Sequence, residues 1–83
     1  MNHKIYAIFD SKSEAYSLPF YYQFDGQALR TVKDWLNNPE TPYAKHPEDY
    51  TLFSLGSYAD DTGTITQDHI TSISNLLNLK DQT

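Results

Sequence analysis

The chain has 83 residues, of which 39% are hydrophobic and 14% aromatic, and it has no cysteine. This length allows a single domain, the apolar content excludes a disordered chain, and no segment is long and apolar enough for a signal peptide or a membrane span. The net charge of −5 lies entirely in residues 40–83, which disfavours tight binding to duplex DNA. We therefore expect a soluble cytoplasmic protein without cofactors.

A central strand is expected over residues 4–9. Side chains alternate between the two faces of a strand. Both sets are apolar here: Ile5, Ala7 and Phe9 on one face, and Tyr6 and Ile8 on the other. Such a strand belongs in the middle of a sheet. Ser11 and Glu14 then match a capping box, which predicts one helical turn.

A second strand is expected over residues 18–24, with Leu18, Phe20, Tyr22 and Phe24 on one face. Pro19 has no backbone N–H, so this strand should lie at an edge or enter the sheet only after Pro19. The aromatic residues between positions 16 and 24 leave two interpretations open. Either they form a stacking platform for single-stranded bases, or only Tyr16 and Tyr21 are exposed.

The main helix is expected over residues 26–38, with Asp25 as its cap and Pro39 beyond its end. Its apolar stripe consists of Ala28, Leu29, Val32, Trp35 and Leu36, and Trp35 should be buried against the sheet. Arg30 and Lys33 lie outside this stripe. They are candidates for a phosphate contact, with solvated surface cations as the alternative.

Residues 39–49 are expected to form a loop that Pro39, Pro42 and Pro47 stiffen, and a long stiff loop is a candidate recognition surface. The candidate binding residues are Lys45, His46, Glu48, Asp49 and Tyr50. A histidine beside two acids also resembles a metal site, but no two-histidine helical spacing or cysteine cluster supports it. We expect no metal, and expect a carboxylate of this loop to accept hydrogen bonds from loop amides.

A hairpin is expected over residues 50–66, with a turn at Asp60, Asp61, Thr62 and Gly63. Gly63 should adopt the left-handed conformation. The first strand should carry Tyr50, Leu52 and Tyr58 on one face, and Thr51, Phe53, Leu55 and Ser57 on the other. Ile70, Ile73, Leu76 and Leu77 then favour a weak helix over residues 68–79, capped by Asp68, with an irregular tail as the alternative. Residues 80–83 should fray.

Together these elements predict an α+β fold: residues 1–79 form one domain with a mainly antiparallel sheet of about four strands and one main helix on one face. No catalytic constellation is found. Asp61, Thr62 and Gly63 match the aspartic-protease triplet, but Asp60 precedes them and the flanking residues are typical of an exposed turn. We expect no enzyme.

Several short segments also match a known pattern. They are Phe9-Asp10-Ser11-Lys12, Glu14-Ala15-Tyr16, Pro19-Phe20, Ala28-Leu29-Arg30, Asn38-Pro39, the run from Lys45 to Phe53, Leu55-Gly56 and the turn from Asp60 to Gly63. In this order, over residues 4–66, the chain resembles the small nonstructural protein of gokushoviruses, single-stranded DNA bacteriophages of the Microviridae. The resemblance implies a protein that is absent from the virion, is made in the host cytoplasm and assists genome replication at the switch to single-strand synthesis.

Three functions are compatible with these observations. The first is a replication accessory that binds a phage or host replication protein. The second is a weak single-stranded DNA binder that uses Tyr16 or Tyr21 with Arg30 and Lys33. The third is an acidic decoy, because carboxylates cluster over residues 40–68. A small core without disulfides also makes association with a second copy physically sensible.

Overall fold

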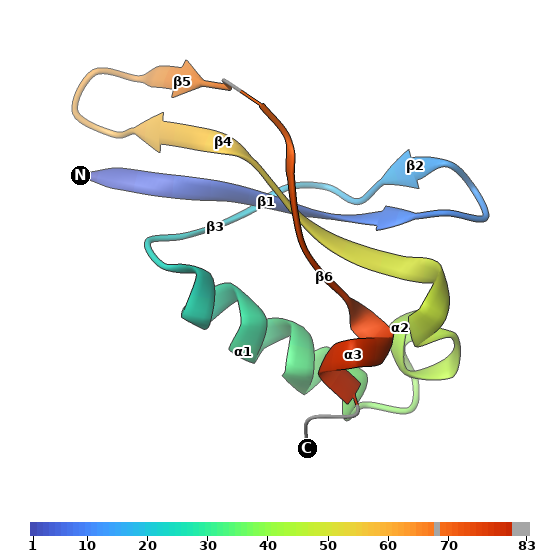
Figure 1. Ribbon diagram of the computed structural model, residues 1–83. Helices are drawn as coiled ribbons and strands as arrows, with labels where there is room; N and C mark the ends of the chain where they lie inside the picture. Colours follow the sequence, from blue (N-terminus) through green and yellow to red (C-terminus); the bar gives the residue numbers. More distant parts are fainter. Residues whose placement is uncertain (68, 81–83) are drawn as a thin grey trace.

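The computed structural model describes residues 1–67 and 69–80. Its sheet is built around two long antiparallel strands, β1 (Asn2–Asp10) and β4 (Tyr50–Ala59). β1 is buried on both faces, since its residues 5–8 are at most 8% exposed. The expected central strand is therefore confirmed, and β4 has the predicted bounds (Figure 1).

Each central strand is flanked by two short strands that follow one another along its outer edge. β2 (Ala15–Tyr16) and β3 (Phe20–Tyr22) pair with β1. β5 (Thr64–Thr66) and β6 (Thr71–Asn75) pair with β4. All these pairs are antiparallel, so the 6-stranded sheet occupies four strand positions and confirms the α+β prediction.

Pro19 lies in the break between β2 and β3, and Ser17 bridges that break. The Ser17 N–H donates to the Ile8 carbonyl at 2.8 Å, and the Ser17 Oγ accepts from the Ile8 N–H at 2.9 Å. β3 thus begins after the proline, as expected. The predicted strand was too long, however: Leu18 and Phe24 lie outside it and are 89% and 65% exposed.

Residues 11–14 between β1 and β2 form a single tight turn, but its side-chain acceptor is Asp10 and not the predicted cap Ser11. The Asp10 carboxylate accepts from the Lys12 N–H at 2.9 Å and from the Ser13 hydroxyl at 3.0 Å. The Glu14 N–H donates to the Asp10 carbonyl at 2.8 Å, and Glu14 has a φ of 57°. Asp10 therefore closes the turn at the place where a helix cap was expected. The hydrogen bond from the Lys12 N–H lowers the pKa of the Asp10 carboxyl.

Helix α1 (Asp25–Leu36) covers one face of the sheet, as predicted. Its buried residues Ala28, Val32 and Leu36 form one core cluster with Tyr6, Ile8, Leu52, Leu76 and Leu79. Asp25 is the first helical residue and not the cap: the Gln27 Oε1 accepts from the N–H of Phe24, the residue before the helix, at 3.1 Å. Asn37 is the C-cap, which confirms the expected end of the helix.

Trp35 is only half-buried, which corrects the prediction of a buried anchor. Its ring lies edge-on to Phe20 of β3, with centroids 5.3 Å apart, and stacks on Tyr43 at 5.6 Å. Tyr43 in turn meets Tyr50 edge-on at 4.9 Å. Trp35 therefore joins the sheet to the segment after α1 and stays partly exposed to solvent.

The segment that was predicted as a stiff loop contains two short helices, α2 (Pro42–Lys45) and η1 (Pro47–Asp49). Each begins with a proline, whose fixed φ suits the first helical position. The Thr41 Oγ1 accepts from the Ala44 N–H at 3.2 Å and caps α2. Within residues 1–67 and 69–80, no loop amide donates a hydrogen bond to the carboxylate of Glu48 or Asp49, contrary to expectation.

The chain after β5 differs most from the prediction. Residues 71–75 form β6, and helix α3 (Leu76–Lys80) begins only at Leu76. The sequence of β6 is rich in Ser and Thr, which form helices poorly, and it pairs with the otherwise free edge of β4. The predicted cap Asp68 and residues 81–83 of the predicted frayed tail lie outside the described residues.

No helix in the described part of the chain is long and apolar enough to cross a membrane.

Candidate binding surface

A bulge in β4 decides which side chains reach each face of the sheet. Ile5 pairs with Gly56, but the next residue of β1, Tyr6, pairs with Ser54, so Leu55 has no partner on β1. An extra residue of this kind shifts the alternation along the strand. Tyr58 consequently lies on the face opposite to Leu52, although the sequence predicted that they share a face.

Gly56 allows this arrangement because β5 comes very close to it. A Cβ atom at position 56 would lie 2.2 Å from the Thr66 carbonyl oxygen. Only glycine lacks the Cβ, so no other residue fits here without a shift of the backbone. The bulge and Gly56 together place the hairpin of β4 and β5 beside the start of β1.

The face of the sheet opposite α1, which we call the open face, carries mainly aromatic and aliphatic side chains. Figure 1 shows α1 and α3 on the other side of the sheet. The register assigns alternate residues of β1 and their partners to the open face. Its aromatic and aliphatic members are His3, Ile5, Ala7 and Phe9 of β1, Tyr16 of β2, Tyr21 of β3, Phe53 and Tyr58 of β4, and Ile65 of β5, and Thr51 and Gly56 of β4 lie on the same face.

At one end of the open face, three rings pack on one another. The centroid of Phe9 lies 4.8 Å from that of Tyr16 and 6.1 Å from that of Phe53, and those of Tyr16 and Phe53 are 5.7 Å apart. At the other end, His3, Tyr21, Tyr58 and Ile65 line a groove of about 410 Å³. This volume is within the usual range of ligand sites, roughly 300–1,000 Å³. We call it the hairpin groove.

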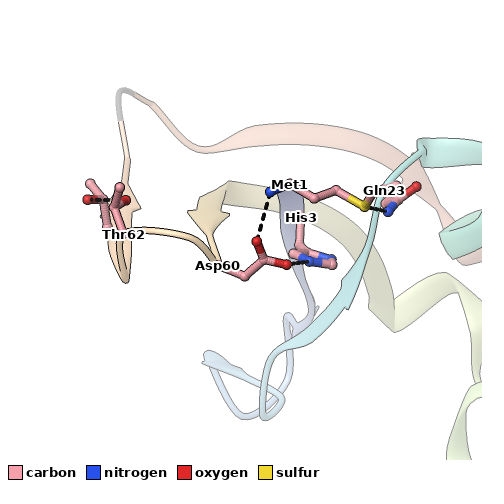
Figure 2. A network of polar contacts seen from close by, with 6 residues as sticks. Met1, His3, Gln23, Asp60 and Thr62 are labelled. Atoms are coloured by element: carbon pink, nitrogen blue, oxygen red, sulfur yellow. Dashed lines mark hydrogen bonds and ion pairs between the residues drawn. The ribbon is translucent and has the colours of Figure 1, made fainter.

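Asp60 fixes one wall of the hairpin groove (Figure 2). Its Oδ1 accepts from the amino group of Met1 at 2.7 Å, and its Oδ2 lies 2.8 Å from the His3 Nε2. The amino group and His3 lower the pKa of the Asp60 carboxyl. The Gln23 Nε2 also donates to the Met1 Sδ. These contacts hold the start of β1 between the β4–β5 turn and Gln23, which lies between β3 and α1.

The residues that were predicted to bind DNA do not lie together. Arg30 and Lys33 are on α1, on one side of the sheet, whereas Tyr16 and Tyr21 lie on the open face. Tyr16 and Tyr21 are 45% and 51% exposed, so both rings are accessible, but the interpretation that only these two are exposed is wrong, because Phe24 is 65% exposed. The combination of these rings with the helix cations is not assembled in the structure.

The structure brings together three of the remaining candidates, His46, Glu48 and Asp49. Their potential ligand atoms lie within 4.8 Å of one another, and the His46 Nδ1 is 3.7 Å from the Glu48 Oε1. His46 and Glu48 are solvent-exposed. Tyr50 contacts the ring of Tyr43, so its role in the structure is packing. Lys45, at the end of α2, lines a pocket of about 360 Å³ with Lys80 and the C-terminal end of α1.

The predicted loop and the hairpin do not form one surface. Residues 39–49 precede the first residue of β4, whereas the turn at residues 60–63 follows its last residue. A strand of this length spans roughly 30 Å, because the rise is about 3.3 Å per residue. Figure 1 shows the two regions at opposite ends of the sheet. The carboxylates of the acidic half are split in the same way, so they do not form one decoy patch among the described residues.

His3, Tyr58 and Ile65 were not recognised as candidates from the sequence. One signal for an apolar face on the second side of the sheet was β1 itself. Its residues are apolar on both faces, and the sequence predicts one main helix, which can pack against only one of these faces. A glycine inside a strand pattern was a second signal, because it marks a bulge or a close backbone approach.

Comparison with known proteins shows the family to which this chain belongs. The family model described as Phage ORF5 protein matches residues 3–79. The chain belongs to this family. The match continues beyond residue 66, where the sequence resemblance ended, and includes β6 and most of α3. Membership of the Phage ORF5 family makes this a phage protein; searches of curated proteins and of solved structures found no significant match.

Proposed function

We propose that this member of the Phage ORF5 family is a nonstructural accessory protein of a gokushovirus. It assists viral genome replication, at the switch to single-strand DNA synthesis, by binding a phage or host replication protein. It acts in the host cytoplasm, is absent from the virion and performs no catalysis. The replication role rests on the resemblance over residues 4–66.

The open face is the observation that supports binding to a protein. Large apolar side chains that stay exposed together on a monomeric protein mark sites of interaction, and on the open face they flank the buried Ile5 and Ala7. Here Tyr16, Tyr21 and Ile65 are 45%, 51% and 69% exposed on one face of the sheet. Aromatic residues of this kind are enriched at the centres of protein interfaces.

Single-stranded DNA binding is a second candidate, favoured by the exposure of Tyr16 and Tyr21. Bases stack on exposed rings, but such platforms are normally combined with a positive groove. Lys4 is the lysine of β1, and the register places it on the helix side of the sheet, where its Nζ contacts the Asp25 carboxylate at 3.3 Å. Lys4 therefore does not accompany the rings of the open face.

The proposed function can be tested in infected cells. A phage with an early stop codon in this gene should accumulate duplex viral DNA and make less single-stranded genome than the parent phage. Strand-specific hybridisation at successive times after infection measures both forms. A phage that carries a synonymous codon at the same position is the control. If the ratio of single-stranded to duplex DNA is unchanged by the stop codon, the replication role is wrong.

A further inference from the structure

We infer that the hairpin groove is the contact site for the protein partner, and that the partner inserts an apolar or aromatic side chain flanked by Lys or Arg. This inference rests on the proposed function and specifies the chemistry of the partner. Its basis is the combination of an apolar groove with an acidic turn at its edge.

The lining of the groove suits an apolar anchor. Tyr58 and His3 face one another with ring centroids 6.4 Å apart, and Tyr21 and Ile65 complete the lining from β3 and β5. The four residues come from four different strands, so the sheet itself holds them in place. A side chain that enters a pre-formed groove loses little conformational entropy, and such pockets commonly receive the residues that dominate binding energy.

The charges around the groove favour a cationic partner. None of the lining residues is Lys or Arg. The turn supplies Asp60, which is paired with the Met1 amino group, and Asp61, which is exposed and has no ion-pair partner in the described part of the chain. A cation beside the groove can contact Asp61, and it can also lie over the faces of Tyr21 and Tyr58.

The same charges disfavour two other occupants. A second copy would bring another chain of net charge −5, with the same acidic turn, against this end of the molecule. A nucleic acid would bring phosphates to a site without Lys or Arg, and cations supply most of its affinity. A basic protein segment has the opposite charge and an apolar part, so it fits both features.

The test uses the full chain labelled with ¹⁵N and four probes, each followed by NMR chemical-shift changes. The first probe is a short peptide with one tryptophan between lysines. The second replaces the tryptophan with glycine, the third replaces the lysines with glutamates, and the fourth is an oligothymidylate. We expect the first peptide to shift the resonances of His3, Tyr21, Tyr58 and Ile65. The glycine and glutamate peptides should bind at least about tenfold more weakly, which corresponds to about 1.4 kcal/mol.

Two variants at exposed positions keep the test independent of folding. Tyr21→Ala and Ile65→Ala should each weaken binding of the tryptophan peptide by roughly tenfold, the usual effect of truncating an important contact. Leu18→Ala is the matched control, because Leu18 is apolar and 89% exposed but does not line the groove. It should leave binding unchanged. Unchanged amide spectra away from the substitutions will show that the variants are folded.

Other outcomes would overturn the inference. Shifts centred outside the groove, or equal binding of the glutamate peptide, would exclude a cationic partner at this site. Concentration-dependent line broadening at the groove without peptide would assign it to a second copy, and binding of the oligothymidylate there would assign it to DNA. If the groove binds the tryptophan peptide but the stop codon leaves replication unchanged, only the proposed function fails. If the stop codon alters replication but the peptide does not bind, only the inference fails.

Discussion

Gly56 is the residue on which the geometry of the hairpin groove depends most directly. Gly56→Ala would place a Cβ 2.2 Å from the Thr66 carbonyl oxygen, in contact with backbone that cannot rotate away as a side chain could. We expect it to reduce the free energy of unfolding by about 1–3 kcal/mol, as overpacking usually does. Urea denaturation followed by circular dichroism measures the change.

Gly26→Ala is the matched control for this prediction. Nothing lies within 4 Å of a Cβ at position 26, which is in the first turn of α1. Alanine forms helices better than glycine, so this variant should be as stable as the parent or more stable by up to about 1 kcal/mol. Equal stability of the Gly56→Ala variant and the parent would mean that β5 does not approach β4 as closely as described.

A second residue-scale feature is the hydrogen bond between a buried tyrosine and a helix-terminal acid. The Tyr6 hydroxyl donates to the Asp25 Oδ1 at 2.7 Å. Burial, followed by the hydrogen bond to Asp25, raises the pKa of Tyr6, and the Tyr6 hydroxyl lowers the pKa of Asp25. The position of Asp25 in the first turn of α1 adds to the second effect, because helix N-termini favour negative charge.

These shifts predict two pH ranges in which stability falls. The contribution of neutral Tyr6 is fully present below about pH 10, the ordinary tyrosine pKa, and is lost as the pH rises above it. The contribution of ionised Asp25 is present above about pH 4 and is lost as the pH falls. Tyr6→Phe should reduce stability at neutral pH by about 1–3 kcal/mol, since it removes a hydrogen bond to a charged group.

The pH dependence itself distinguishes this contact from simple packing. Stability of the Tyr6→Phe variant should decrease less steeply than that of the parent above pH 10 and below pH 4, because a phenyl ring at this position can neither ionise nor donate to Asp25. Urea midpoints measured across this pH range give both slopes. Tyr21→Phe is the control for loss of a hydroxyl, because Tyr21 lies half-exposed on the open face, and it should leave stability at neutral pH unchanged. Parallel curves for Tyr6→Phe and the parent would contradict the proposed linkage.

At the scale of elements, the β4–β5 hairpin depends on the conformation of its turn. Gly63 has a φ of +73°, as predicted, and its N–H donates to the Ala59 carbonyl at 2.8 Å. No atom lies within 4 Å of a Cβ at this position, so the cost of a substitution comes from the backbone alone. Gly63→Val should therefore cost about 1 kcal/mol or more, whereas Gly63→Asn should cost less, because Asn tolerates this region. Thermal melting of the three versions measures the order, and equal midpoints would contradict it.

Much of the element order could be predicted from the sequence, because long periodic segments determine their own structure. β1, β4, α1 and the turn at Gly63 each carry such a pattern. Two features were not predicted, because they depend on contacts distant in the sequence, although Gly56 inside the strand pattern is a signal for the first. The bulge at Leu55 follows from pairing with β1, which moves Tyr58 to the open face. Residues 71–75 become a strand because β4 offers a free edge, although Ile73 and Leu76 have the spacing of a helix.

The candidate site was less predictable than the fold for the same reason. His3 and Ile65 are far apart in the sequence, and only the register of three neighbouring strands makes them line one groove. The candidates predicted from the sequence were instead selected by residue type and by their neighbours in the chain, as cations on a helix or as acids beside prolines. Their binding role stays a prediction.

At the scale of the whole molecule, the sheet separates the cations of the helix layer from the exposed rings. Arg30 and Lys33 are on α1, and Lys45 lies near the end of that helix with Lys80. Tyr16 and Tyr21 lie across the sheet on the open face. A strand of DNA cannot stack on these rings and at the same time neutralise its phosphates on the helix layer, since the sheet lies between them.

This separation predicts weak binding of single-stranded DNA. For the parent chain, with net charge −5, we expect a dissociation constant no tighter than about 10 μM at physiological salt, with a shallow dependence on salt because few phosphates are neutralised. Fluorescence anisotropy with a labelled oligonucleotide at two salt concentrations measures both quantities. The variants Arg30→Ala and Lys33→Ala test the alternative directly. If the parent chain binds the oligonucleotide with a submicromolar dissociation constant and these substitutions abolish binding, the helix layer binds DNA without the rings of the open face. A DNA-binding function would then replace the protein-binding proposal.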